Sequence, residues 1–338
     1  MQKLIREVHP DIYRIRLPLP GKKPGPANAY LFMGKPATLL DTGTRQGYPH
    51  LKKALASLGL SPADLDQVVI THGHVDHFGA ARRLRADSGG RIRVLVHEAD
   101  RRSVETGRDM PTLAVGRFLR LAGLPYHYLV PLFLLFQVFR AMAPSCRVDE
   151  TFVDGDVLEL GRYQGRVIHT PGHTPGSSCI FLESENILFS GDHVLGHITP
   201  NALVEVDVTN ILPTRPVQKE FYQSLEKIEQ LDPGKVFTGH RKPVEDFPAI
   251  ARMYRENFEA RRQAIMAILE QGEKTVYQTA RELFPELDNT TRLSLEIYLA
   301  ISEVYTHLQA LEDEGRVKLL AEKGRILIHL ENGKQGKP

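Results

Sequence analysis

The sequence predicts a mixed α/β protein, with two sheets inside and helices outside, followed by a small domain of helices and a hairpin. Three observations lead to this prediction. Short apolar runs typical of strands alternate with helical segments as far as about residue 250. Side chains able to bind metal directly follow several of these strands. Beyond residue 250 the pattern changes to three helices and a final pair of strands.

The first part of the chain is expected to form strands and helices in turn. Strands are predicted at 12–17, 29–33, 37–40, 68–70, 92–96, 157–160, 165–168, 178–182, 187–189 and 235–238. Helices are predicted where apolar residues recur at helical spacing, from Leu51 to Leu58, around Ala81 and Leu84, and across 219–231. Gly59 is expected to end the first of these helices.

Length and composition set broad limits. The 338 residues suffice for two domains, which we place at 1–250 and 251–338. With 42% hydrophobic residues, 25% charged residues and a formal net charge of +2, the chain has no overall attraction to nucleic acid or membrane. Cys146 and Cys179 lie far apart, so we expect free thiols in a reducing compartment. No long apolar segment follows the N-terminus, so we expect a cytoplasmic location.

Four metal-capable side chains crowd into six positions after the strand at 68–70. Because alternate residues of an extended chain face the same way, His72 and His74 can point at one metal ion. Asp76 and His77 fall where the helical signal begins, turned toward a second position. No packing role needs such a cluster, and burying it without a ligand would be costly.

This His-x-His-x-Asp-His motif resembles the signature of the metallo-β-lactamase superfamily, over about residues 1–250. Three later segments, Thr-Pro-Gly-His, Phe-Ser-Gly-Asp and Phe-Thr-Gly-His, supply the remaining positions at His173, Asp192 and His240. The resemblance implies an αββα sandwich with two metal ions. The implied ligands are His72, His74 and His173 for one ion, Asp76, His77 and His240 for the other, and Asp192 as a bridge. His169, His193 and His197 lie nearby in the sequence but are not needed to complete two sites.

A further aspartate, in the segment Asp41-Thr42-Gly43, ends the strand at 37–40. In the superfamily that the chain resembles, this segment lies beneath the metals, so Asp41 is a candidate to orient a ligand by a hydrogen bond. The alternative is a turn that merely closes the strand.

The predicted ligands indicate the chemistry. Imidazole and carboxylate donors without thiolate suit two divalent ions, for which we expect Zn²⁺, with Fe²⁺ or Mn²⁺ as alternatives. Two such ions can bridge a hydroxide that is available at neutral pH. Asp76 and Asp192 are the expected catalytic carboxylates, and Asp192 can also orient the hydroxide and shuttle a proton. The expected reaction is hydrolysis.

Residues 103–147 interrupt the strand–helix alternation with an apolar helical insertion. Its run from Leu124 to Phe139 is too short to span a bilayer, and Pro131 is expected to divide it. The insertion either caps the metal cleft, with Phe133 and Phe136 binding an acyl-type substrate, or packs on the sandwich or in a homodimer interface.

The C-terminal domain resembles a winged helix, which some metallo-β-lactamase-fold proteins carry, including relatives that cleave RNA. Its third helix, expected from Leu293 to Glu314, would be the recognition helix. This segment has five acidic residues and no Lys or Arg, whereas phosphate binding needs basic residues. We therefore favour a structural role over nucleic-acid binding.

Two functions follow from these patterns. The first is a dimetal hydrolase in which the bridging hydroxide attacks an ester or thioester of a small molecule, similar to the glyoxalase II branch. The chain departs from glyoxalase II around His240, where it reads Thr-Gly-His-Arg-Lys-Pro, which disfavours glutathione thioesters. The alternative is an endoribonuclease or phosphodiesterase that uses the same site.

Overall fold

The structure is a computed structural model that describes residues 4–19, 24–107, 112–196, 198–200, 203–206, 212–289 and 295–331. It divides into two compact units. The first comprises Met1–Asp109, Phe139–Pro200 and Gln223–Ala251, and the second Met110–Val138, Asn201–Tyr222 and Arg252–Pro338. Most of the apolar segment treated above as an insertion thus groups with the C-terminal helices. The domain limits at 250/251 stay a prediction and fall inside one continuous helix, α8 (Phe247–Leu269).

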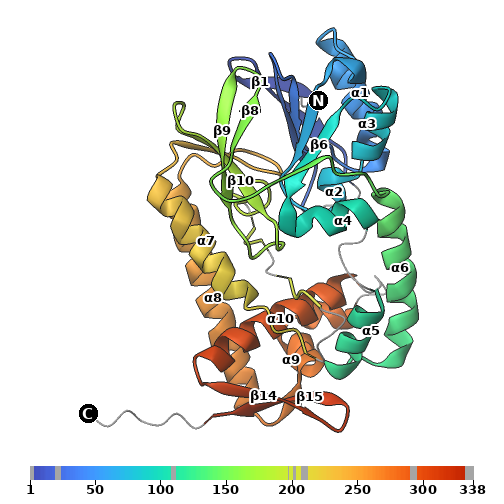
Figure 1. Cartoon of the computed structure of the whole chain (residues 1–338). Coiled ribbons are helices and arrows are strands. Elements are labelled where there is room, and N and C mark those ends of the chain that lie inside the picture. The colour runs from blue at the N-terminus through green and yellow to red at the C-terminus, as the bar shows by residue number, and fades with distance from the viewer. Residues whose placement is uncertain are drawn as a thin grey trace. The chain divides into compact units, whose positions relative to one another are not determined.

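The first unit contains two sheets (Figure 1). A seven-stranded sheet has its strands in chain order: β1 (Ile5–His9), β2 (Ile12–Leu17), β3 (Ala27–Phe32), β4 (Thr38–Leu40), β5 (Gln67–Ile70), β6 (Arg93–His97) and β7 (Glu150–Phe152). A five-stranded sheet has the order β12 (Lys235–Phe237), β11 (Ile187–Phe189), β10 (Ser178–Leu182), β9 (Tyr163–His169), β8 (Val157–Leu160). These findings confirm the predicted mixed α/β fold.

Strand periodicity explains how the larger sheet is covered on both faces. Successive side chains of a strand point to opposite faces. Val69 of β5 packs in a core shared with Phe189 and Phe237 of the smaller sheet. Its neighbours Val68 and Ile70 pack in a second core, together with side chains of α1 (Tyr48–Ser57) and α3 (Ala81–Asp87). Two-sided burial is why the strand reads as a continuous apolar run.

Shorter elements complete the first unit. They are α2 (Val75–Phe78), α4 (Arg101–Thr106) and the part of α7 (Val217–Leu231) that begins at Gln223. The hairpin of β10 and β11 and the helix ending before Gly59 lie where the sequence predicts them. Cys146 and Cys179 are free, as expected, and both are buried.

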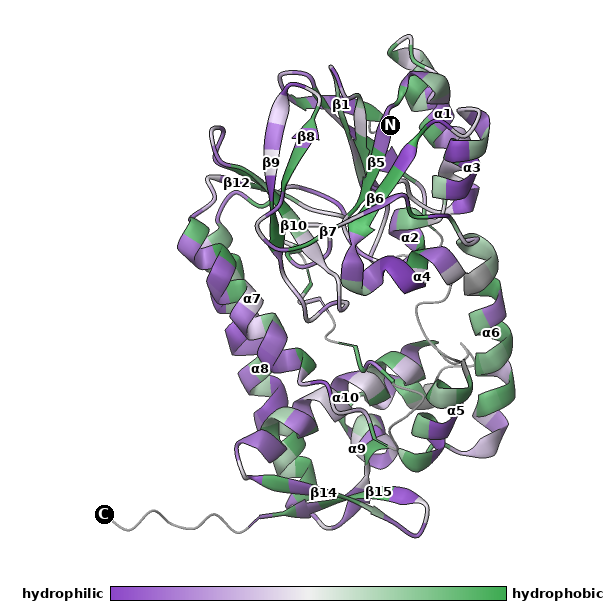
Figure 2. Ribbon diagram, in the orientation of Figure 1, coloured by the Kyte–Doolittle hydropathy of each residue, from purple (hydrophilic) through white to green (hydrophobic). Residues whose placement is uncertain are grey.

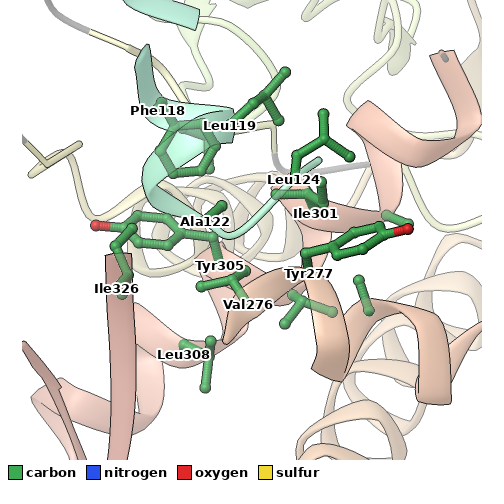
Figure 3. Close-up of a cluster of buried hydrophobic side chains, with 14 of the residues drawn as sticks. Phe118, Leu119, Ala122, Leu124, Val276, Tyr277, Ile301, Tyr305, Leu308 and Ile326 are labelled. Carbon is green, nitrogen blue, oxygen red and sulfur yellow. The ribbon is translucent and has the colours of Figure 1, made fainter. Parts of the chain in front are cut away.

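The second unit is built around α10 (Leu295–Asp313). Tyr298, Ile301, Tyr305 and Leu308 of this helix are buried in one apolar cluster. Figure 3 shows Phe118 of α5 (Thr112–Leu121) beside Tyr305, with ring centroids 5.0 Å apart. The remaining elements are α6 (Leu129–Met142, in this unit as far as Val138), α9 (Val276–Leu283), β13 (Lys274–Thr275), β14 (Val317–Glu322) and β15 (Arg325–Leu330).

The α6 helix differs from expectation at Pro131. The proline does not divide the segment, because it falls in the first turn of α6, where its missing N–H has no helical partner to lose. Within the described residues, no helix has the length and apolar character needed to cross a membrane.

A buried histidine makes the second unit sensitive to acid. Burial, with the charges of Arg262 and Arg261, lowers the pKa of His307 to about 3. The unfolded chain, with an ordinary histidine pKa, binds a proton below about pH 6.5 that the folded chain excludes. Stability is therefore expected to fall as the pH drops below about 6.5.

The histidine contribution can be measured by denaturant unfolding at pH 7 and pH 4.5. Between these values the wild type should lose about 2 kcal/mol more than His307→Gln, which cannot titrate. His329→Gln, at a half-buried histidine of the same unit, serves as the comparison for the loss of a histidine as such. An identical acid response in His307→Gln and wild type would contradict this account.

Candidate metal centre

The candidate site lies in the first unit, where strands of both sheets end. Because β4 and β5 are parallel, as are β11 and β12, each pair ends at a common edge. Asp41 follows β4, the His72–His77 segment follows β5, Asp192 follows β11 and His240 follows β12. His173 lies in the loop between β9 and β10. The fold thus gathers the seven predicted ligands from distant parts of the chain.

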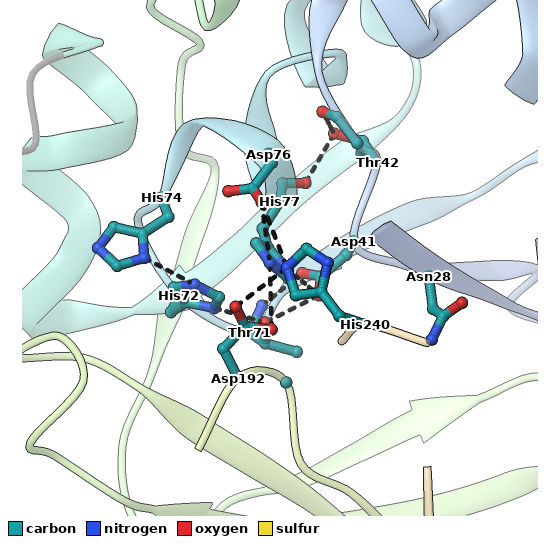
Figure 4. A network of polar contacts seen from close by, with 12 residues as sticks. Asn28, Asp41, Thr42, Thr71, His72, His74, Asp76, His77, Asp192 and His240 are labelled. Carbon is teal, nitrogen blue, oxygen red and sulfur yellow. Dashed lines mark hydrogen bonds and ion pairs between the residues drawn. The ribbon is translucent and has the colours of Figure 1, made fainter. Parts of the chain in front are cut away.

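The gathered atoms form three overlapping groups, each with its ligand atoms within 4.8 Å of one another. Figure 4 labels their members except His173. These groups are His72, His74 and His173; His72, His77 and Asp192; and Asp76, His77 and His240. The first and third have the membership that the resemblance to the superfamily implies for two metal sites.

Asp192 lies between the two predicted ligand sets. Its Oδ2 is 3.1 Å from Nε2 of His240 and 3.9 Å from Nε2 of His173, and its Oδ1 is 3.4 Å from Nε2 of His77. Asp76 approaches from the other side, with Oδ2 3.3 Å from Nε2 of His240. A carboxylate so placed can contact groups from both sets.

Each of three histidines has its other ring nitrogen held by the protein. Nδ1 of His77 lies 2.8 Å from Oδ2 of Asp41, and Nδ1 of His240 lies 3.0 Å from the carbonyl oxygen of Gly25. Nδ1 of His72 lies 3.0 Å from Oγ1 of Thr71. Such contacts fix the orientation of an imidazole and favour the tautomer whose free nitrogen can bind metal.

Asp41 does more than contact His77. It accepts hydrogen bonds from the backbone N–H and the hydroxyl of Thr71, both at 2.8 Å. Asp41 is buried and adopts a positive φ of 61°, a conformation that aspartate tolerates better than most residues. The residue therefore ties the start of the ligand segment to the end of β4.

Burial sets the protonation of the first ligand set. It lowers the pKa of His72 well below its ordinary value, and the charges of neighbouring histidines lower it further. Burial also lowers the pKa of His74, although Asp76 and Asp192 oppose that shift. Both imidazoles are therefore neutral near pH 7, as a metal ligand must be.

The carboxylates dominate the second set. Burial lowers the pKa of His77, but the charges of Asp192, Asp41 and Asp76 outweigh it and leave that pKa well above its ordinary value. The same balance, with Asp192 the strongest neighbour, raises the pKa of His240 to about 10. Burial opposes ionisation of Asp192, whereas His240 and His77 hold its pKa well below its usual range. Metal binding here would displace protons from the two imidazoles.

These residues fit divalent metal ions. Nε2 of His77 and Nε2 of His240 are buried and, within the described part of the chain, make no hydrogen bond of normal geometry, although oxygens of Asp192 lie 3.4 and 3.1 Å from them. Both nitrogens belong to rings whose Nδ1 is already held, so once their protons are displaced their lone pairs are available to a metal ion. Buried polar atoms are normally satisfied, and a cation surrounded by these donors would satisfy them.

The backbone just before His240 passes very close to the side chains of the candidate site. A Cβ atom on Gly239 would lie 2.1 Å from Oδ1 of Asp192 and 2.9 Å from Cε1 of His77. Only glycine therefore allows the segment before His240 to pass beside the bridging carboxylate.

Asp100, which the sequence analysis missed, joins the two loops that carry the first ligand set. Its Oδ2 accepts hydrogen bonds from the backbone N–H of Gly73 at 2.7 Å and the hydroxyl of Thr174 at 2.6 Å. Its Oδ1 accepts one from the N–H of Gly176 at 2.8 Å. The sequence could have pointed to Asp100, because this residue lies shortly after the strand at 92–96, as Asp41 lies after β4.

The remaining candidates are not members of this cluster. His193 and His169 belong to none of the three groups found among the described residues, and His169 instead stacks on His97 at 4.0 Å. His197 lies outside the described residues. Phe133 and Phe136 belong to the second unit, where they line a groove.

Comparison with known proteins supports the fold. The model of the metallo-beta-lactamase superfamily matches residues 23–240, and the chain belongs to that superfamily. The chain is 27% identical over 314 residues to the probable metallo-hydrolase YqjP of Bacillus subtilis, covering 90% of this chain and 93% of that protein. It is also 26% identical to the lactamase-like protein aptB of Emericella nidulans, over 81% of this chain and 73% of that one.

Solved structures give the same result. A metallo-beta-lactamase family protein from Thermus thermophilus is 26% identical, with a TM-score of 0.74 over 96% of this chain and 100% of that chain. A beta-lactamase domain protein from Burkholderia ambifaria shares the fold, with a TM-score of 0.76 at 21% identity, over 96% of this chain and 93% of that one.

The role of Asp100 can be tested through metal affinity. Asp100→Asn keeps the shape of the side chain but weakens the three hydrogen bonds that join the ligand loops. We expect zinc affinity, measured by competition with a chromophoric chelator, to fall about ten- to a hundred-fold. The matched control is Asp149→Asn, because Asp149 also accepts a backbone N–H, from Val94, but lies away from the ligand loops. Unchanged affinity in Asp100→Asn would show that the loops hold their positions without this carboxylate.

Proposed function

We propose that the protein is a dimetal hydrolase. His72, His74 and His173 would hold one ion, Asp76, His77 and His240 the other, and Asp192 would contact both. The observation that carries this proposal is the buried cluster in which two ligand sets meet at one carboxylate. The donor set of imidazoles and carboxylates favours zinc, with iron or manganese as alternatives.

The metals would supply Lewis acidity and a water of lowered pKa, which is what hydrolysis at neutral pH requires. The protein's own residues then have definite tasks. Asp192 can accept a proton and return it, and its Oδ2 lies 3.1 Å from Nε2 of His240. Asp76 can take part in the same proton transfer, because its Oδ2 lies 3.3 Å from that nitrogen. Asp41 holds the ring of His77 in orientation through its Nδ1.

The proposed substrate is an ester or thioester of a small acyl-type molecule. Its support is the apolar groove of the second unit, which includes Phe133 and Phe136 among its lining residues. The proposed reaction is similar to that of the glyoxalase II branch, which hydrolyses thioesters, but the proposed substrate is not a glutathione thioester.

An endoribonuclease is the second candidate. Its support is the order of elements α8, β13, α9, α10, β14 and β15, which is the arrangement proposed for a winged helix. One observation counts against it. The helix that would read nucleic acid, α10, is buried along most of its length, and Glu303 on it pairs with Arg261 at 2.8 Å. A helix enclosed in this way cannot enter a groove of nucleic acid.

A substrate panel separates these candidates. The metal-loaded protein is assayed on short and long acyl thioesters, simple esters, a phosphodiester and single-stranded RNA. We expect turnover of thioesters or esters, reduced at least about a hundred-fold in Asp192→Asn because that variant loses the charge shared by both ligand sets. RNA cleavage without acyl activity would overturn the acyl proposal, and activity unaffected in Asp192→Asn would place catalysis elsewhere.

Chain-length preference tests the two phenylalanines. Phe133→Ser and Phe136→Ser should lower kcat/KM for long-chain substrates by about ten-fold or more, because buried methylene contacts are lost, and should spare short-chain substrates. Leu134→Ser is the matched control, since Leu134 is exposed on the same helix outside the groove. Equal losses on both chain lengths would remove these residues from substrate selection.

A further inference from the structure

The second unit exposes an unusual amount of apolar surface over α5, α6 and the turn between them. Six of the nine large hydrophobic side chains exposed in the described residues lie between Leu113 and Val138. Leu113 is 87% exposed, Tyr126 70%, Val130 68% and Phe133 47%. Figure 2 shows α6 as hydrophobic along most of its length. Contiguous exposed apolar surface usually marks a binding site.

This surface is concave. A cavity of about 550 Å³ is lined by Leu113, Tyr126, Val130 and Phe133 on its exposed walls, with the buried Leu132 and the half-buried Phe136 at its base. The base is anchored, because the Phe136 ring packs edge-on against Tyr298 of α10 at 5.7 Å. The volume falls within the range of pockets that bind small organic ligands.

Positive charge borders the cavity. Arg117 and Arg120 also line it, and since they are three residues apart on α5 they lie on the same face of that helix. None of the lining residues among those described is acidic. The sequence explains why, because it has no Asp or Glu between Asp109 and Asp149. A ligand here meets hydrocarbon walls and two guanidinium groups.

We propose that this groove binds a linear aliphatic chain that carries an anionic oxygen group, such as an acyl carboxylate or an alkyl phosphate. The chain lies against Leu113, Val130 and Phe133, and the anionic group pairs with Arg117 and Arg120. Arginine suits this task because its planar donors match carboxylate and phosphate oxygens. Calling this ligand a substrate or product rests on the proposed function, whereas the binding itself does not.

Charge and shape favour this occupant over two others. A two-fold dimer closed on the groove would bring the exposed Arg120 of both copies into one interface, where none of the described lining residues is acidic. A membrane surface would need an apolar surface that protrudes into the lipid, whereas this one is hollowed and anchored at its base.

Calorimetric titration of the full-length protein tests the proposal without any hydrolysis. The probes are dodecanoate, hexanoate and dodecyl phosphate, each below its micelle concentration, and dodecanol below its solubility limit. We expect saturable binding of dodecanoate and dodecyl phosphate, at least about ten-fold tighter than that of dodecanol. Hexanoate should bind far more weakly, since each buried methylene contributes about a four-fold gain in affinity.

Variants assign the two contributions. Arg117→Gln combined with Arg120→Gln should remove the preference for the anions over dodecanol, while Phe133→Ser should weaken all three twelve-carbon probes. The controls are Arg102→Gln and Leu134→Ser, which change an exposed arginine and an exposed leucine outside the groove. These two control variants should bind the anionic probes and dodecanol with the affinities of the wild type.

Three results would overturn the proposal. One is an absence of saturable binding, and another is equal affinity for dodecanoate and dodecanol. The third is binding that the groove variants do not alter. Sedimentation with anionic vesicles, or concentration-dependent dimerisation lost in Phe133→Ser, without dodecanoate binding, would assign the surface to a membrane or to a second copy instead. Because no turnover is measured, failure here is distinct from failure of the proposed hydrolase activity.

Discussion

Two buried carboxylates, Asp41 and Asp100, hold the candidate site together. Each follows a strand of the larger sheet, accepts a backbone N–H from the segment after β5, and accepts a side-chain or ring contact as well. A buried carboxylate without such donors would be costly. The same bonds that satisfy these carboxylates therefore position the loops, and the metal-binding geometry depends on them.

This arrangement explains how so many ionisable groups share one small volume. The acidic side chains hold His77 and His240 by charge, while burial keeps His72 neutral. Glycine at 239 removes the Cβ that would otherwise clash with Asp192. The cluster could hold a divalent cation, which would relieve the crowding of imidazole nitrogens and carboxylate oxygens.

The second unit has different physical requirements. Its central helix, α10, is buried by α5, α9 and the β-hairpin. The apolar residues of α10 therefore serve stability rather than recognition. The segment Leu113–Phe136 instead keeps apolar side chains in solvent and excludes acidic residues. Such surface costs solubility, so we attribute it to ligand binding.

The sequence by itself determined the mixed α/β fold and most strand positions, because periodicity is a local signal, and the crowded His72–His77 segment could be read directly from its spacing. The other candidate ligands, His173, Asp192 and His240, were implied by the resemblance to the superfamily. The sequence also determined that the segment around Phe133 is apolar. Only the tertiary structure showed that Asp100 joins two loops far apart in the chain, through its hydrogen bonds to Gly73 and Gly176. Only the tertiary structure showed that residues 110–138 group with the C-terminal helices and that α10 is buried along most of its length. These features depend on long-range packing, which no local pattern encodes.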